Sequence, residues 1–373
     1  MAKSHWIERR LPPTDSPLAT ATVTLAAIVL ALLLGGLLML PFTPHPGQAY
    51  WAIVENAFGS LRGLGFTLVK ATPLILIALG TIVAWRTSFF YLGFEGALLL
   101  GAAATVWVAL RAAPQEGLAG LPGWIFFPLV IGAAFAAGGL WAGAVGFLRS
   151  RFGGNEVLVS LMTNYVAILL VNYLVSGPLR APGDLPQTER IPETTLLPFF
   201  IPDTRAHAGF LLALLAALLV WLFLRRTPLG YELIATGFSE RAARYGGIPT
   251  SQRLVLAAFL AGGLGALAGL VEVLGVQFRL MEGIAQGTGF VGVVVALLGK
   301  LNPLGSVVAA ILYAGMGVGS EVLQRRAGLP SSVIFIVQSL IVLLILAGDL
   351  LRSYRFTWPF RAERLTATAG PRE

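Results

Sequence analysis

The stretch HAGFLLALLAALLVWLFLR, residues 207–225, decides the fold class of this chain. Residues 208–224 carry no charge, and Arg225 and Arg226 then end the run. A bilayer core roughly 30 Å thick is crossed by about 20 predominantly apolar residues of helix. Because the apolar run is continuous and does not alternate, we predict a membrane-spanning helix here and not a strand of a barrel.

The composition of the whole chain points to the same class. Of its 373 residues, 56% are apolar and only 12% are Asp, Glu, Lys or Arg, and the mean hydropathy is +0.80. Soluble domains carry about twice that share of charge, so a soluble enzyme and a disordered chain are excluded. The absence of cysteine excludes a disulfide-stapled domain and thiolate metal sites.

Ten such runs predict an all-α, polytopic integral membrane protein with about ten transmembrane helices. The third and eighth runs are short and glycine-rich. We expect them to be tilted, broken or re-entrant, which is tolerated only where protein or a water-filled cavity surrounds the backbone. The predicted spans cover residues 19–40, 63–85, 97–112, 124–148, 157–176, 207–225, 254–275, 286–300, 303–323 and 332–351.

The distribution of basic residues predicts that both termini are cytoplasmic. With the N-terminus inside and ten spans threaded, 17 of the 26 Lys and Arg residues fall on inner segments, eight on outer segments and one, Lys70, within a span. Lys and Arg are enriched on the cytoplasmic side of membrane proteins. The net charge of +8 is therefore interpreted as a topology signal and not as a nucleic-acid-binding surface.

This topology divides the chain into two cytoplasmic tails, residues 1–18 and 352–373, and a transmembrane domain, residues 19–351. The domain contains a proline-rich outer loop, 177–206, and a long cytoplasmic loop, 226–253. The first apolar run is too long for the h-region of a signal peptide, so we expect an uncleaved span.

Motifs of soluble catalysis are missing. The phosphate-binding string G-x-x-x-x-G-K-S/T is absent, and neither H-E-x-x-H nor G-x-S-x-G occurs. The three histidines, His5, His45 and His207, are far apart in sequence. We therefore expect no catalytic residue, no metal site and no cofactor in this chain, and transport is the function class that remains.

The long cytoplasmic loop contains the signals of a short helix. Ser239 is a good N-cap, and Glu240 suits the positive end of the helix dipole. Gly246 or Gly247 can take the left-handed conformation at the C-terminus, and Pro249 blocks continuation. The pattern predicts a rigid helix of about two turns.

This predicted helix presents Ala242 and Ala243 as a small, flat face that another protein can approach closely. The alternative is a solvated turn that merely links two spans. Two further pairs, Gly265-x-x-x-Gly269 and Gly315-x-x-x-Gly319, indicate close packing between spans.

Four blocks, in order along the chain, resemble the permeases of bacterial ATP-binding cassette importers, in the branch for nucleosides, simple sugars and branched-chain amino acids. They are residues 90–102, 153–165, 233–248 and 289–305. Block 233–248 is similar to the family's cytoplasmic coupling segment. Departures from the family pattern occur at Tyr91, Ala97, Ile234, Ser239 and Glu240, where Asn, Gln, Arg, Asn and Pro are usual.

The resemblance implies the transmembrane permease subunit of such an importer, in the plasma membrane. A separate ABC ATPase, carrying ATP and Mg²⁺, would dock on the coupling segment. A second permease, identical or related, would complete the pore, and an external solute-binding protein would deliver the solute. Membrane lipid surrounds the spans, and no nucleic acid is expected as a partner. The implied coupling residues are Gly237, Ser239, Glu240, Ala242, Ala243, Arg244 and Gly247.

Five residues are candidates for the translocation path: Tyr91, Glu95, Asn164, Asn172 and Phe290. The two aromatic rings would stack on a base or sugar, or else anchor helix ends at the interface. The two asparagines, eight residues apart on one helical face, would bond a hydroxylated solute or else join helices. Glu95 would contact solute or, as we favour, accept hydrogen bonds from freed backbone N–H groups.

Other charges lie in or near spans, among them Lys70, Glu272 and Glu321. An unpaired charge in lipid is costly, so these side chains should face protein or water, and Lys70 is expected to reach the interface or pair with a carboxylate.

The expected solute is a nucleoside or simple sugar. One alternative function is an ion-gradient-driven secondary transporter, which needs paired acidic residues at mid-membrane; the acidic residues here are scattered and mostly near span ends. A lipid-handling enzyme or assembly factor is a third possibility, disfavoured by the missing nucleophile and metal ligands.

Overall fold

The computed structural model of the chain describes residues 7–9, 17–41, 45–112, 118, 121–201, 204–327 and 331–356. Most of the predicted tails, 1–18 and 352–373, therefore lies outside the described residues. Within the described ranges the chain is helical apart from two short strands, β1 (Ile7–Arg9) and β2 (Tyr354–Phe356).

Every predicted span corresponds to a helix, which confirms the all-α class. Helices α2 and α8 were not predicted. Two short helical turns, the 3₁₀ turn η1 (Glu193–Thr195) and the π-helical turn η2 (Val273–Gln277), complete the set. The helices are α1 (Pro17–Met39), α2 (Pro46–Phe58), α3 (Leu61–Arg86), α4 (Phe94–Leu110), α5 (Gly123–Phe152), α6 (Glu156–Ser176), α7 (Gly209–Arg226), α8 (Pro228–Phe238), α9 (Glu240–Tyr245), α10 (Thr250–Glu272), α11 (Thr288–Leu298), α12 (Pro303–Ala327) and α13 (Ser331–Ser353).

Among the described residues, six helical segments are long and apolar enough to cross a membrane. The third and eighth runs form short helices, α4 with 17 residues and α11 with 11, and their tilted, broken or re-entrant course stays a prediction. The total of ten spans stays a prediction. The six segments are Leu61–Arg86, Gly123–Phe152, Glu156–Ser176, Gly209–Arg226, Thr250–Gln277 and Pro303–Val322.

The residues group into two compact units, a division that the sequence pattern does not indicate. One unit comprises Met1–Tyr50 with Gln324–Glu373, and the other comprises Trp51–Leu323. In the first unit α1 packs against α13, and β1 pairs antiparallel with β2. The second, larger unit contains the hydrophobic core and all the candidate residues for coupling and translocation.

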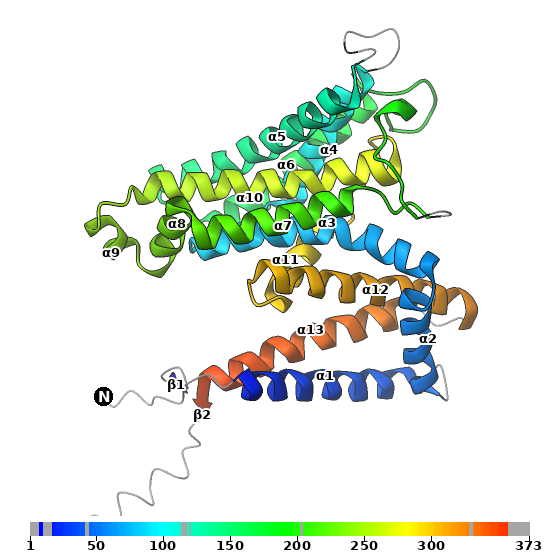
Figure 1. Cartoon of the computed structure of the whole chain (residues 1–373), viewed down its shortest axis with the longest axis vertical. Helices are drawn as coiled ribbons and strands as arrows, with labels where there is room; N and C mark the ends of the chain where they lie inside the picture. Colours follow the sequence, from blue (N-terminus) through cyan, green and yellow to red (C-terminus); the bar gives the residue numbers. More distant parts are fainter. Residues whose placement is uncertain are drawn as a thin grey trace, which may run out of the picture. The chain divides into compact units, whose positions relative to one another are not determined.

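Helix α10 is the centre of the larger unit, where it packs against α3, α4 and α5 (Figure 1). Glycine permits this close approach. A Cβ at Gly262 would lie 2.2 Å from the carbonyl oxygen of Gly138, and one at Gly269 would lie 2.0 Å from that of Leu98. Side chains at these positions would collide with the backbone of a neighbouring helix, so the predicted close packing at Gly265-x-x-x-Gly269 is confirmed.

The second small-residue pair packs against α2, the helix that was not predicted. A Cβ at Gly319 would lie 2.3 Å from the carbonyl oxygen of Ile53, and one at Gly315 would lie 2.4 Å from the ring of Phe58. Gly315 and Gly319 therefore set how closely α12 approaches this part of α2.

The outer loop predicted at 177–206 is held by main-chain hydrogen bonds to the segment that follows α10. Thr188 N donates to Leu280 O at 2.9 Å, and Ile191 N donates to Phe278 O at 3.0 Å. The guanidinium of Arg205 donates to Val276 O at 2.6 Å. Since helical hydrogen bonding is interrupted after η2, the loop supplies partners for backbone groups that the helix no longer satisfies.

His207 is buried where this loop meets α7. Its Nδ1 accepts a hydrogen bond from Gly209 N at 3.1 Å. A Cβ at Gly275 would lie 2.3 Å from its Nε2, so the ring also packs against η2. Burial lowers the pKa of His207 to about 4, because the protonated ring would be poorly solvated inside the protein.

We predict that the protein loses stability as the pH falls from about 6.5 toward 4. The unfolded chain takes up a proton at His207 in that window, whereas the folded chain does not, and protonation therefore favours unfolding. His207→Asn keeps an acceptor for the Gly209 N–H group but does not titrate, so it should flatten the pH dependence. The measurement is the thermal unfolding midpoint in detergent between pH 7.5 and 4.5.

The matched control is His45→Asn, because His45 is an exposed histidine. This variant should keep the wild-type pH dependence. An unchanged slope in the His207→Asn protein would contradict the assignment.

Candidate functional site

The loop between α7 and α10 folds as two helices, α8 and α9, that meet at Ser239. The Ser239 hydroxyl accepts a hydrogen bond from Ala242 N at 3.3 Å, which confirms the predicted N-cap. Glu240 and Arg244 form an ion pair one turn apart at 2.6 Å. Gly247 takes the left-handed conformation at φ 81°, as expected for one of the two glycines. The predicted short helix is therefore correct.

The predicted flat face of Ala242 and Ala243 is wrong. Successive residues of a helix point about 100° apart, and α9 contacts both α8 and α10, so Ala243 is buried while Ala242 stays exposed. The residues that stand out are Phe238 and Tyr245, which are 86% and 91% exposed. In the sequence they are the aromatic residues that flank or end the short helix.

Three contacts hold α8 within the larger unit, against the end of α3 and the start of α10. Gly237 packs on the end of α3, where a Cβ would lie 2.1 Å from Arg86 O. The Ser88 hydroxyl donates to Gly237 O at 2.7 Å. Glu232 of α8 forms an ion pair with Arg253 at the start of α10. These contacts hold the α8–α9 segment against both α3 and α10.

Glu95, at the start of α4, joins two helix N-termini. Its two carboxylate oxygens accept hydrogen bonds from Gly287 N at 2.7 Å and Gly289 N at 2.8 Å, where α11 begins. A negative charge is favourable at a helix N-terminus, and here it lies at two of them. This confirms the interpretation of Glu95 as an acceptor for freed backbone N–H groups.

Asn164 of α6 ties that helix to the start of α4. It accepts from Gly96 N at 2.8 Å and donates to Leu92 O at 3.0 Å, and the Ser160 hydroxyl accepts from Leu92 N at 3.1 Å. Asn164 is buried, so its polar atoms are used within the protein. Of the two predicted uses of this residue, the structure shows the one that joins helices.

The remaining candidates differ in exposure. Tyr91 is fully buried; its ring packs against Phe89 and Phe94, and its hydroxyl donates to Gly93 O at 2.8 Å. The structure thus places Tyr91 in the core and not at a surface that a solute reaches. The side chain of Phe290, in contrast, is 45% exposed.

Asn172 lies toward the other end of α6, apart from the contacts that Asn164 makes. Its amide donates to the Glu282 carboxylate at 2.9 Å. Glu282 belongs to the segment between η2 and α11, so this bond reaches the non-helical break from α6.

A charged cluster connects α3, α10 and α12. Lys70 forms an ion pair with Glu321, and both side chains remain about half exposed. Glu272 accepts from the Gln277 amide at 3.0 Å and interacts electrostatically with Lys70 and Arg205. The expected pairing of Lys70 with a carboxylate is confirmed. In the described part of the chain, no group of three or more His, Cys, Asp or Glu residues is arranged to hold a metal ion.

We predict that Glu95→Ala lowers the free energy of unfolding by on the order of 3 kcal/mol, because one buried and one partly buried N–H group lose a charged acceptor. Glu95→Gln keeps one acceptor oxygen, so its free energy of unfolding should lie between those of Glu95→Ala and the wild type. The measurement is chemical or thermal unfolding of the purified chain in detergent. Glu189→Ala, at an exposed carboxylate, is the control; equal stability of the two alanine variants would refute the role.

Comparison with known proteins gives the family. The family model described as "Branched-chain amino acid transport system / permease component" matches residues 63–346. The guanosine ABC transporter permease protein NupP of Bacillus subtilis is 36% identical over 336 residues, which cover 88% of this chain and 94% of that protein. No solved structure matches the chain.

Two further relatives align over similar lengths. The glucose ABC transporter permease protein TsgB13 of Haloferax volcanii is 31% identical and covers 93% of this chain and 92% of its own. The nucleoside ABC transporter permease protein NupB of Lactococcus lactis is 29% identical and covers 87% and 90%.

The apolar helices and these relatives agree on a multi-pass protein of the inner membrane. The family match includes the α8–α9 segment and the polar contacts of Glu95 and Asn164. The chain therefore belongs to the family of permease components of branched-chain amino acid transport systems and is a permease subunit of an ATP-binding cassette transporter.

Proposed function

We propose that the chain, with a second permease, forms the membrane path of an importer for a nucleoside or simple sugar. The observation that carries the solute class is the set of long relatives named for guanosine, nucleosides and glucose. These solutes share hydroxylated rings, which hydrogen-bonding side chains recognise. An external solute-binding protein would deliver them.

The α8–α9 segment is the proposed docking element for a separate ATPase, which would carry ATP and Mg²⁺. Phe238 and Tyr245 present exposed rings on a segment that is fastened to α3 and α10. Aromatic side chains of this kind contribute strongly to binding when a partner buries them. Gly237 and Ala243 support the segment from within, and Ala242 lies on its outer side.

The same end of the larger unit is proposed to be cytoplasmic. Arg86, Arg225 and Arg226 lie at the ends of α3 and α7, next to the α8–α9 segment, and basic residues mark the inner side of a membrane protein. Ten spans with both termini inside fit this orientation.

The outer half of the solute path is proposed to pass the cluster of Lys70, Glu321, Glu272 and Gln277. Lys70 lies nine residues into α3, roughly 14 Å from its start. A half-exposed ion pair at that depth is too costly against lipid, so it must face water or protein. Asn172 and Phe290 stay candidates for the path.

We predict that Phe238→Ala and Tyr245→Ala each weaken assembly with the ATPase subunit by tenfold or more, about 1.4 kcal/mol. Loss of a ring that the partner buries removes apolar contact without changing charge. The measurement is the dissociation constant between permease and ATPase in lipid nanodiscs.

The control for docking is Trp124→Ala, which removes a ring that is 77% exposed at the start of α5. It should leave assembly unchanged. Wild-type affinity in both the Phe238 and Tyr245 variants would contradict the proposed docking surface.

The complete transporter should take up labelled guanosine or glucose, and unlabelled leucine should not compete. Lys70→Ala should lower this uptake tenfold or more, because it leaves Glu321 unpaired beside the path. Arg62→Ala, which removes an exposed cation near the start of α3, is the control. Competition by leucine alone would reject the solute class, and wild-type uptake in Lys70→Ala would reject the path.

A further inference from the structure

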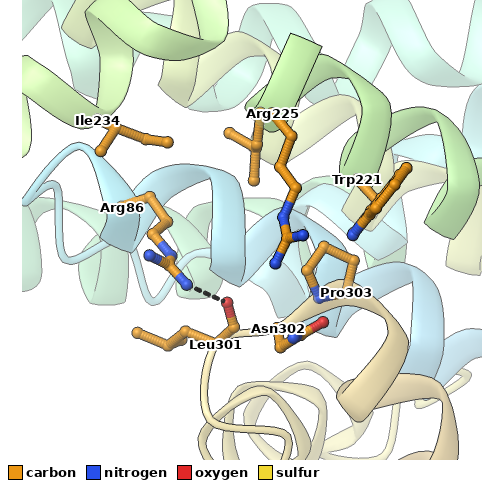
Figure 2. A pocket seen from close by; sticks show the side chains of 8 residues that line it. Arg86, Trp221, Arg225, Ile234, Leu301, Asn302 and Pro303 are labelled. Carbon is orange, nitrogen blue, oxygen red and sulfur yellow. Dashed lines mark hydrogen bonds between the residues drawn. The ribbon is translucent and has the colours of Figure 1, made fainter.

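A pocket of about 150 Å³ lies where α3 and α7 end and α12 begins (Figure 2). Its walls include Arg86 from α3, Trp221 and Arg225 from α7, Ile234 from α8, and Asn302 from the turn before α12. Figure 2 shows the two arginine side chains pointing toward that turn from two different helices. The pocket is smaller than the roughly 300–1,000 Å³ of pockets for drug-sized ligands.

The charged side chains that line this pocket are all positive. Two guanidinium groups line it, and none of its lining residues is acidic. Arg86 donates to Leu301 O at 3.0 Å, which occupies one of its five N–H groups. Arg225 lies over the Trp221 ring at 5.3 Å, and it is absent from the ion pairs of the described residues. The pocket therefore offers several N–H donors to a small anion.

One helix terminus, the start of α12, adds to the positive charge of the two arginines, whereas the ends of α3 and α7 carry partial negative charge. α12 begins at Pro303, and the Asn302 side chain accepts from Leu304 N at 3.1 Å as its cap. The start of α12 thus contributes partial positive charge to the pocket. Favourable interaction with the C-terminal carbonyls of α3 and α7 accounts for an arginine at each helix end. It does not account for their convergence on one cavity beside a helix N-terminus.

The position of the pocket at the ends of membrane helices indicates which kind of anion it binds. The pocket lies at the ends of two apolar helices, and Trp221 is the kind of ring that lies at the headgroup level of a bilayer. Basic pockets between membrane helices bind anionic headgroups, and arginine pairs with phosphate through two parallel hydrogen bonds. We propose that this pocket binds the phosphate of an anionic lipid headgroup. In the proposed orientation this lipid belongs to the inner leaflet, and only that assignment rests on the proposed function.

Such a lipid would act on the α8–α9 segment. Ile234 of α8 lines the pocket, and the main-chain carbonyl of Arg86 packs against Gly237, where α8 meets α3. A bound phosphate would neutralise Arg86 and Arg225 and hold α3, α7 and the start of α12 together at the base of α8. Occupancy should therefore stabilise the protein without any ATPase present.

The test compares purified full-length permease in detergent micelles with added phosphatidylglycerol, added phosphatidylcholine or inorganic phosphate. Lipid retention is read by native mass spectrometry and stability by the thermal unfolding midpoint. We expect phosphatidylglycerol to be retained at least tenfold better than phosphatidylcholine and to raise the midpoint. Arg225→Gln should remove both effects, and Arg225→Lys should keep part of the retention because it keeps the charge.

Arg226→Gln is the matched control, since Arg226 is the next residue on α7, is exposed and does not line the pocket. It should behave as the wild type. Equal losses in Arg225→Gln and Arg226→Gln, or no loss in Arg225→Gln, would overturn the site. A midpoint rise with inorganic phosphate alone that matches phosphatidylglycerol would overturn the lipid as its source. Neither readout involves transport. A negative result would therefore reject the lipid site without contradicting the proposed function.

Discussion

The Glu95 carboxylate is the contact on which the irregular part of the larger unit depends. Between η2 and α11 the chain leaves regular helix, and a bilayer offers no water to the backbone groups that this exposes. Glu95 accepts from Gly287 N and Gly289 N and so closes the start of α11 against the start of α4. Asn164 then joins α4 to α6 by the same means. The outer loop satisfies the other side of the break.

Close packing joins α10 to the helices around it. Glycines at 262 and 269 let α10 contact the backbone of α5 and α4. One end of α10 carries Arg253, paired to Glu232 of α8, and the other continues into η2 and Glu272 beside Lys70. The tightly packed α10 therefore connects the α8–α9 segment to the residues of the proposed outer part of the path.

Local features were predictable because they depend on neighbouring residues. The ten apolar runs became helices, Ser239 became an N-cap, and Gly247 took the left-handed conformation. Helix α2 escaped prediction because Glu55 and Asn56 interrupt its apolar run, and its packing partners on α12 are far away in sequence. The error at Ala243 has another cause: its neighbours in sequence, α8 and α10, fold back against α9 and bury it, and the short motif does not indicate how these helices turn.

The sequence by itself determined that the chain is a helical membrane protein of a permease family, because continuous apolar runs and short motifs are properties of adjacent residues. Only the tertiary structure decided what each polar group does. It directed Glu95 and Asn164 to backbone groups, placed Tyr91 in the core, left Phe238 and Tyr245 in solvent, and brought Arg86 and Arg225 to one pocket. These outcomes depend on which distant helices meet, and in a glycine-rich bundle that is set by backbone-to-backbone packing.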